Sequence, residues 1–221
     1  MELLSVNLAR VVWFVPARDV NPRGLNGWNT LFPALIERYK FVSYPKKEES
    51  FNPNREPGEK FIGGEFLNAQ GMPIMLHFTS YDDGIVADTR SSTQDSENFL
   101  IEFSQWIVSD FGLTFRPEMI RSKGYVSELY VTSDGSLSNL NPQLQRFADR
   151  VSSLIEGHRE PIPYETSGIS FAATTEFKPA SFIFERATDT LFPENRYYSK
   201  APLHTDVHLT LLNELEEILK A

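Results

Sequence analysis

Between residues 60 and 89 the sequence holds three strand-like segments with no stretch between them long enough to form a helix. The segments 60–67, 73–81 and 84–89 are rich in aromatic and β-branched residues, which favour strands. Strands joined by so few residues pair antiparallel, because a parallel pair needs a crossover connection of about a dozen residues or more. A mostly antiparallel sheet is therefore predicted, with further strands at 4–15, 125–132, 168–173, 180–186 and 197–198.

Apolar residues at helical spacing predict four helices, at about 30–39, 96–111, 142–156 and 206–219. The third has Asn141 as a candidate N-cap, Pro142 at its first position and Gly157 as its stop. Each helix carries an apolar stripe, and we expect the stripes to face the core. The two stripes used below are Leu144, Phe147, Ala148, Val151 and Ile155 on 142–156, and Leu211, Leu212, Leu215, Ile218 and Leu219 on 206–219.

The order of these elements predicts the α+β class, with a mostly antiparallel sheet and about four helices packed on one side of it. Strand, helix, several strands and helix follow one another twice, which suggests two topologically similar halves. A chain of 221 residues can bury a core without disulfides or metals. We expect a single domain over residues 1–221, with a subdivision into 1–115 and 124–221 as the alternative.

The net charge of −9 is concentrated in residues 61–120, which hold two basic and nine acidic residues. Nucleic acids and anionic membranes are bound largely through Lys and Arg, so we expect neither as a partner. The acidic region is compatible with a basic protein partner, but we favour a role in solubility. The absence of cysteine excludes a disulfide framework, a thiolate metal site and a cysteine nucleophile.

The first residues do not resemble a signal peptide. Glu2 stands where a basic residue is typical, and the apolar run 11–15 is too short for a signal core. The same run is far too short to cross a membrane. On this basis we expect a cytoplasmic protein.

Gly63-Gly64-Glu65-Phe66 resembles the signature hairpin of diguanylate cyclases, in which glycines let the backbone approach a guanine nucleotide and acids hold metal. The resemblance covers four residues and lacks the second acid of the family pattern. The family's upstream Asp-x-Asp-x-Phe-Lys element is also absent, and Phe-Val-Pro-Ala-Arg-Asp precedes the motif instead. Two glycines before a strand residue suit a β-bulge or tight turn, which is what we predict.

Tyr81-Asp82-Asp83-Gly84 lies between two predicted strands. Adjacent aspartates on a hairpin can bind two divalent ions for phosphoryl transfer, provided that a neighbouring strand end supplies a further carboxylate, for which Asp19 is the candidate. The competing interpretation is a hairpin turn in which Gly84 supplies a positive φ. We favour the turn and keep a catalytic site of Asp19, Asp82 and Asp83 as the alternative.

His204, Asp206 and His208 occupy alternate positions, so in an extended segment they would face together and could hold Zn²⁺. They stand, however, at the start of a predicted helix with Thr205 as its N-cap. Their side chains do not converge once the helix begins. We therefore expect no metal and no other cofactor, and keep these three residues as the alternative metal site.

Arginines give the remaining candidate sites. The loop after the first strand contains Arg18 and Arg23, and paired arginines at a strand end can bind carboxylate or phosphate groups. Asp88 and Arg90 share one face of a strand, where they form either a structural pair or a binding spot. We assign these four residues to partner or anion binding. Arg186, by contrast, is expected to end its strand in solvent.

No nucleophile elbow, phosphate-binding loop, dinucleotide glycine pattern or His-Glu-x-x-His motif occurs in the sequence. We therefore expect a non-enzymatic subunit or adaptor that binds another protein, within a multi-subunit assembly or as an acidic inhibitor or immunity-type protein facing a basic partner. The alternative is a divalent-metal-dependent phosphoryl-transfer enzyme built on the Asp-Asp hairpin. A homo-oligomer with an architectural role is a third hypothesis.

Overall fold

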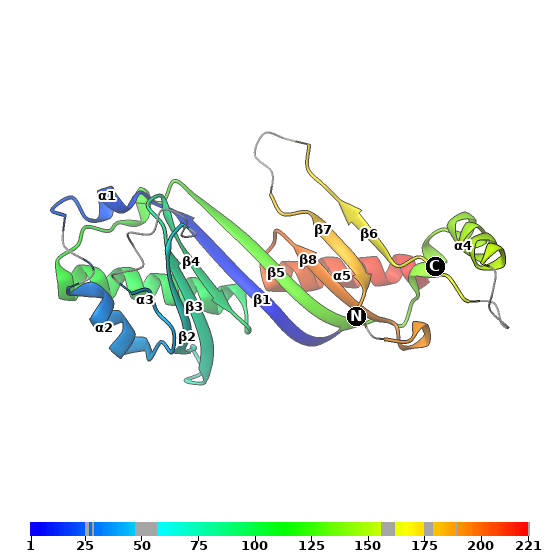
Figure 1. The fold of residues 1–221 in the computed structure, drawn as a ribbon, viewed down its shortest axis with the longest axis horizontal. Coiled ribbons are helices and arrows are strands. Elements are labelled where there is room, and N and C mark those ends of the chain that lie inside the picture. The colour runs from blue at the N-terminus through cyan, green and yellow to red at the C-terminus, as the bar shows by residue number, and fades with distance from the viewer. Residues whose placement is uncertain are drawn as a thin grey trace. The chain divides into compact units, whose positions relative to one another are not determined.

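The computed structural model describes residues 1–24, 27, 29–46, 57–155, 162–174, 179–188 and 190–220. Its strands form an eight-stranded antiparallel sheet in the order β2-β3-β4-β1-β5-β8-β7-β6 (Figure 1). The strands are β1 (Glu2–Phe14), β2 (Glu59–Leu67), β3 (Pro73–Ser80), β4 (Gly84–Thr89), β5 (Ser122–Thr132), β6 (Gly168–Phe171), β7 (Phe182–Arg186) and β8 (Arg196–Ala201). The helices are α1 (Ala17–Val20), α2 (Leu31–Tyr39), α3 (Thr93–Phe111), α4 (Pro142–Leu154) and α5 (Thr205–Lys220). The predicted α+β class and the four longer helices are confirmed.

The chain divides into two compact units. Unit 1 comprises Met1–Asn7 and Glu128–Ala221, and unit 2 comprises Leu8–Ser127. Strands β1 and β5 contribute residues to both units. Most of the predicted loop at 44–57 and of the predicted break at 157–163, including Gly157, lies outside the described residues. None of the helices in the described ranges has both the length and the apolar character needed to span a bilayer.

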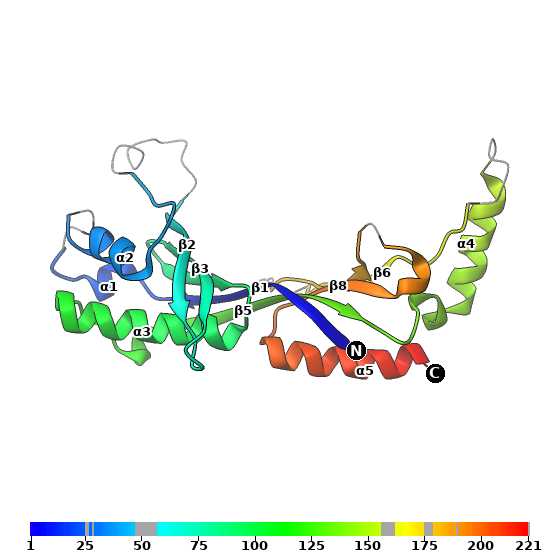
Figure 2. The ribbon, with the colours of Figure 1, turned by 90° about the horizontal axis from the view of Figure 1, so that it is seen from below.

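The core of unit 2 is formed by aromatic residues from its strands and from α2 and α3. Figures 1 and 2 show α3 lying along one face of β2, β3 and β4. Phe99 of α3 is fully buried and makes an edge contact with Tyr39 of α2 at 5.0 Å between ring centroids. Phe61, Phe66 and Phe78 of the strands pack in the same cluster. The aromatic excess of the sequence therefore serves this core.

Helix α3 begins three residues earlier than predicted because Ser92 caps it. The Ser92 side chain accepts a hydrogen bond from the Asp95 N–H, which satisfies one of the free donors of the first turn. At the other end Gly112 adopts φ 62°, a left-handed conformation that suits glycine at a helix end. Both ends of this helix are thus set by residues next to it in the sequence, through the Ser92 side chain at the start and the Gly112 backbone at the end.

The Gly63-Gly64 motif forms the predicted β-bulge. The pairing of β2 with β3 shifts register between Phe61 and Gly64, and Gly63 has φ 70°. A side chain at Gly64 would meet the ring of Phe41, because an added Cβ would lie 2.5 Å from its Cε1 atom. The two glycines therefore serve backbone geometry and close packing.

The Asp82-Asp83 segment forms the predicted turn between β3 and β4, closed by a 2.7 Å hydrogen bond from Tyr81 N–H to the Gly84 carbonyl. The reason given for Gly84 was wrong, since this residue has no positive φ. An added Cβ at Gly84 would lie 2.6 Å from the Trp13 carbonyl oxygen. Glycine is thus required at position 84 because the backbone of β1 passes close to it. This contact joins residues that are far apart in the sequence.

The core of unit 1 lies between α5 and its strands, and Figures 1 and 2 show α5 along one face of β8 and β7. The predicted helix is confirmed, but the side that it buries differs from the predicted stripe. Leu211 and Ile218 are 37% and 59% exposed, whereas Leu212 and Leu219 are fully buried. In the first half of α5 the buried face contains His208 and not Leu211.

Candidate functional site

The predicted catalytic acids lie at one end of unit 2. Asp82 and Asp83 form the β3–β4 turn, and Asp19 lies in the short helix α1. The backbone ties these segments together, because Ala17 N–H donates to the Asp82 carbonyl at 2.8 Å. Tertiary structure therefore brings the predicted acids to the same end of the unit.

Arginines accompany these acids. A shallow hollow of about 400 Å³ is lined by Arg18, Arg121, Asp82 and Asp83, among others. The Asp19 carboxylate lies 3.6 Å from Arg121 and 3.7 Å from Arg18, in ion pairs that are largely exposed. Across the described parts of the chain, no group of three or more His, Asp or Glu side chains is placed to hold a metal ion. Arg18 and Arg121 thus pair with Asp19 and also line the hollow beside Asp82 and Asp83.

The structure does not bring Arg23, Asp88 and Arg90 together into one site. Arg10 of β1 lies opposite Asp88 of β4, and its guanidinium donates to both carboxylate oxygens at 2.7 Å. This bidentate pair joins the two strands. Arg90 is exposed beyond the end of β4, and Arg23 lines a different hollow beside Gly112. Sequence reasoning missed Arg10 because its partner is 78 residues away.

The alternative metal-binding histidines lie at the start of α5. His208 is fully buried in unit 1, and its Nε2 atom lies 2.8 Å from Ser199 Oγ. The Ser199 hydroxyl donates to the Ile183 carbonyl at 2.9 Å, so its oxygen accepts a hydrogen bond from the His208 Nε2–H. Asp206 is exposed in the first turn of the helix. His208 is therefore held as a hydrogen-bond donor in the core.

Burial lowers the pKa of His208 to about 4. The unfolded chain, with a histidine pKa of about 6.5, then binds this proton more readily than the folded chain. The contribution of His208 to the free energy of unfolding is therefore fully present above pH 6.5. It is lost as the pH falls towards 4, by roughly 3 kcal/mol over that window.

We expect urea unfolding followed by far-ultraviolet circular dichroism to show this loss in the wild type between pH 6.5 and 4.5. His208→Gln should lose less stability than the wild type over the same interval, whereas the matched variant His204→Gln should keep the wild-type slope. Equal slopes in the wild type and His208→Gln would contradict a neutral buried imidazole.

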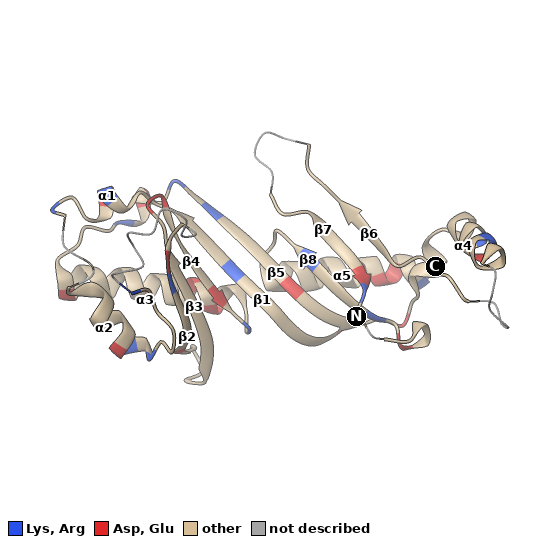
Figure 3. Ribbon diagram, viewed as in Figure 1, with Lys and Arg blue, Asp and Glu red and all other residues tan. Residues whose placement is uncertain are grey.

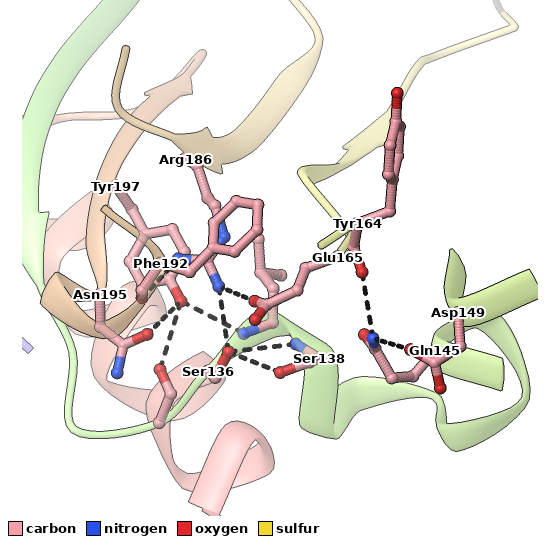
Figure 4. Close-up of polar contacts among 12 residues, drawn as sticks. Ser136, Ser138, Gln145, Asp149, Tyr164, Glu165, Arg186, Phe192, Asn195 and Tyr197 are labelled. Atoms are coloured by element: carbon pink, nitrogen blue, oxygen red, sulfur yellow. Dashed lines mark hydrogen bonds and ion pairs between the residues drawn. The ribbon is translucent and has the colours of Figure 1, made fainter. Parts of the chain in front are cut away.

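Arg186 was expected in solvent, and this was wrong: only 7% of its side chain is exposed. Figure 4 shows its guanidinium enclosed by groups from several segments of unit 1. It pairs with Glu165 at 2.5 Å and donates to the Phe192 carbonyl at 3.0 Å and to Ser136 Oγ at 3.2 Å. Its planar group also lies over the rings of Phe192 and Tyr197, at 4.8 and 5.6 Å. Arg186 thus anchors the segment that carries Glu165.

The segment anchored by Arg186 contacts α4 through polar side chains of the helix. Gln145 donates to the Tyr164 carbonyl at 3.2 Å (Figure 4), and Ser152 donates to the Ile162 carbonyl. A polar hollow of about 600 Å³ lies beside Gln145, Asp149 and Glu165. Gln145 and Ser152 are half-buried together with Ala148 and Val151, so the part of α4 that is shielded from solvent carries both polar and apolar side chains.

The predicted stripe of α4 is not turned to the core as a whole: Leu144 and Phe147 are exposed, whereas Ala148, Val151 and Ile155 are half-buried. The helix begins as predicted, since Asn141 accepts hydrogen bonds from the N–H groups of its first turn and Pro142 follows. None of its residues is buried. Leu144, Phe147 and Leu154 are 51%, 68% and 60% exposed. These three exposed apolar side chains, of which Leu154 lies outside the predicted stripe, are the candidate functional site on α4.

No protein-family model matches this chain, and no curated protein gives a significant match. The functional argument therefore rests on the chemistry and exposure of the side chains described above. The predicted stripe gave Leu144 and Phe147 of the α4 site but missed Leu154, and periodicity could not decide which apolar residues of the helix are buried.

Proposed function

We propose that this chain is a protein-interaction subunit whose helix α4 docks into an apolar groove of a different protein. The observation that carries the proposal is the exposed apolar row of Leu144, Phe147 and Leu154 on a helix that is hydrogen-bonded to its own unit through Gln145 and Ser152. Spacings of three and seven residues place these side chains in one row, as in helices that bind grooves. Exposed apolar rows of this kind mark interaction sites in soluble proteins.

The area of the apolar row favours a groove over a second copy of the same helix. Three side chains present only part of the roughly 800 Å² per partner that a standard interface buries. If two copies of α4 packed against each other through these three side chains, much of the surface of each helix would stay exposed to solvent. A groove would also cover the sides of the helix next to the apolar row. Figure 2 shows α4 apart from α5 and the strands of unit 1, and Gln143, Arg146 and Arg150 of the helix are exposed.

The charge beside the apolar row suggests the chemistry of the groove. Arg146 and Arg150 are exposed and four residues apart, so they lie on the same flank of α4. Figure 3 shows basic and acidic positions interspersed over both units, with both kinds on α4. We therefore propose a groove with carboxylates on its rim, which would pair with these arginines. The basic partner expected from the acidic region 61–120 is a separate proposal and concerns unit 2.

A photo-crosslinking amino acid at Leu144 in the full chain should capture one protein in the source cells, and the same amino acid at exposed Val207 of α5 should not. With the captured protein purified, Phe147→Ser should weaken binding at least tenfold, because aromatic residues central to an interface carry much of its affinity. Val207→Ser, also at an exposed apolar helical position, is the matched control and should leave Kd unchanged. The melting temperature of Phe147→Ser should stay near that of the wild type, since the side chain is exposed.

Equal Kd values for the Phe147→Ser and Val207→Ser variants would contradict the proposal. So would capture of a second copy of this chain together with a stable dimer in sedimentation. A stable dimer would assign the apolar row to self-association instead of a groove.

A further inference from the structure

Unit 2 contains a cavity of about 200 Å³, independent of α4, between α1, α2, α3 and the turn that joins β3 to β4. Its wall, as far as the described residues form it, is mostly apolar. Six of the wall residues pack directly against the buried core of the unit: Val20, Leu31, Phe32, Ile85, Leu113 and Phe115. Ala17 of the wall is exposed, so a small molecule can enter from solvent beside α1. The cavity is therefore a continuation of the core that solvent can reach.

Aromatic contacts hold the wall in place. Phe32 meets Phe61 edge-on with centroids 5.2 Å apart, and Phe103 packs on Phe78 at 4.8 Å. Phe61 and Phe78 are themselves buried in the core. Because protein interiors are close-packed, rings supported from behind in this way cannot move into a neighbouring space without disturbing the core. The cavity is thus preformed.

The polar groups around the cavity indicate the chemistry of a ligand. No residue of the wall within the described ranges is an acid, a histidine, a lysine or an arginine. The Ser104 hydroxyl donates to the Ile101 carbonyl at 2.8 Å, and the Val20 carbonyl accepts from the Thr114 N–H at 2.9 Å. A charged group, or a hydroxyl that finds no partner, would lose its hydration in such a cavity without compensation. A neutral ligand without strong hydrogen-bonding groups fits this wall.

The volume of the cavity sets the size of that ligand. An apolar cavity of about 150 Å³ lined by Leu, Ile and Phe stays dry and binds benzene. The cavity of unit 2 is somewhat larger, at about 200 Å³, and is lined by the same kinds of side chain. We infer that it is a binding site for a neutral, apolar small molecule of about the size of one benzene ring with a short alkyl substituent.

Toluene and phenol, two probes of nearly equal size, test the inference on the full chain. With ¹³C in the isoleucine δ1 methyl groups, the NMR peaks of Ile85 and Ile107 report from the wall, and Ile85→Val and Ile107→Val assign them. Toluene should shift both peaks saturably. The peak of Ile101, which lies on α3 outside this wall, is the internal control and should stay in place. Phenol should bind about tenfold or more weakly than toluene, because its hydroxyl would be buried without a partner.

A matched pair of substitutions locates the site. Val20→Phe adds a ring to the wall of the cavity and should weaken toluene binding about tenfold or more, because the ring occupies the space of the ligand. Val108→Phe makes the same change at a 39% exposed position of α3 outside this wall and should leave toluene binding unchanged. Saturating toluene should raise the melting temperature of the wild type and of Val108→Phe but not that of Val20→Phe, since a ligand stabilises only the folded chain that binds it.

The wild-type titrations do not depend on the folding of Val20→Phe. The inference is overturned if toluene gives no saturable shift of the Ile85 and Ile107 peaks, or if phenol binds as tightly as toluene. It is also overturned if Val20→Phe keeps the wild-type affinity for toluene, or if Val108→Phe weakens binding as much as Val20→Phe does.

Discussion

Replacing Phe99 by alanine is expected to destabilise unit 2 by about 3–5 kcal/mol, the range for removing a buried aromatic side chain. Phe99 is fully buried. Its ring contacts those of Tyr39, Phe66 and Phe78 with centroids 5.0, 5.7 and 5.6 Å apart. These neighbours come from α2, β2 and β3, so alanine leaves a cavity where helices and strands meet. A loss of this size is a large part of the stability of a typical domain.

Tryptophan fluorescence can follow this loss in unit 2 alone. All three tryptophans of the chain lie between residues 8 and 127, which is the range of unit 2. We expect the fluorescence midpoint in urea to fall strongly for Phe99→Ala. The matched variant Phe147→Ala removes a ring that is 68% exposed in unit 1 and should not move this midpoint. A Phe99→Ala midpoint within error of the wild type would show that Phe99 is not central to the core.

Arg186→Leu is expected to destabilise unit 1 by about 3–5 kcal/mol. The change leaves Glu165 without its counter-charge in a part-buried setting, and breaking one side of a buried pair costs more than removing both. The double variant Arg186→Leu/Glu165→Leu should therefore be more stable than Arg186→Leu alone. Phe192 and Ser136 lose their contacts with the guanidinium in both variants.

Amide hydrogen exchange of β7 and β8 measures this effect, because both strands belong to unit 1. Arg196→Leu is the matched control, since Arg196 is half exposed and lies 3.7 Å from Glu194. Exposed pairs of this kind contribute at most about 1 kcal/mol. The prediction fails if Arg186→Leu changes protection no more than Arg196→Leu, or if the double variant recovers nothing.

Features set by neighbouring residues could be predicted well from the sequence. The start of α4 follows from Asn141 and Pro142, and the end of α3 follows from Gly112. The bulge at Gly63 likewise follows from the need for a positive φ in a strand pair. In each case the deciding interaction lies within a few residues, so composition and spacing carry the information.

The candidate sites were harder to predict because they depend on partners far away in the sequence. Arg186 looked like a strand end, yet Glu165 and the rings of Phe192 and Tyr197 enclose it. Gly84 looked like a turn glycine, yet the Trp13 carbonyl is what excludes a side chain there. Neither the enclosure of Arg186 nor the contact at Gly84 can be recognised from the spacing or the neighbouring residues in the sequence.

The sequence by itself determined where helices and strands form, because hydrophobic period, caps and glycine conformation act over one or two turns. Only the tertiary structure decided which face of each element is buried. Helix α5 is rotated so that His208 enters the core, and α4 leaves Leu144, Phe147 and Leu154 exposed while Ala148 and Val151 are half-buried. The physical reason is that an apolar period defines a face but not its partner. Which surface covers that face depends on how distant segments of the chain pack.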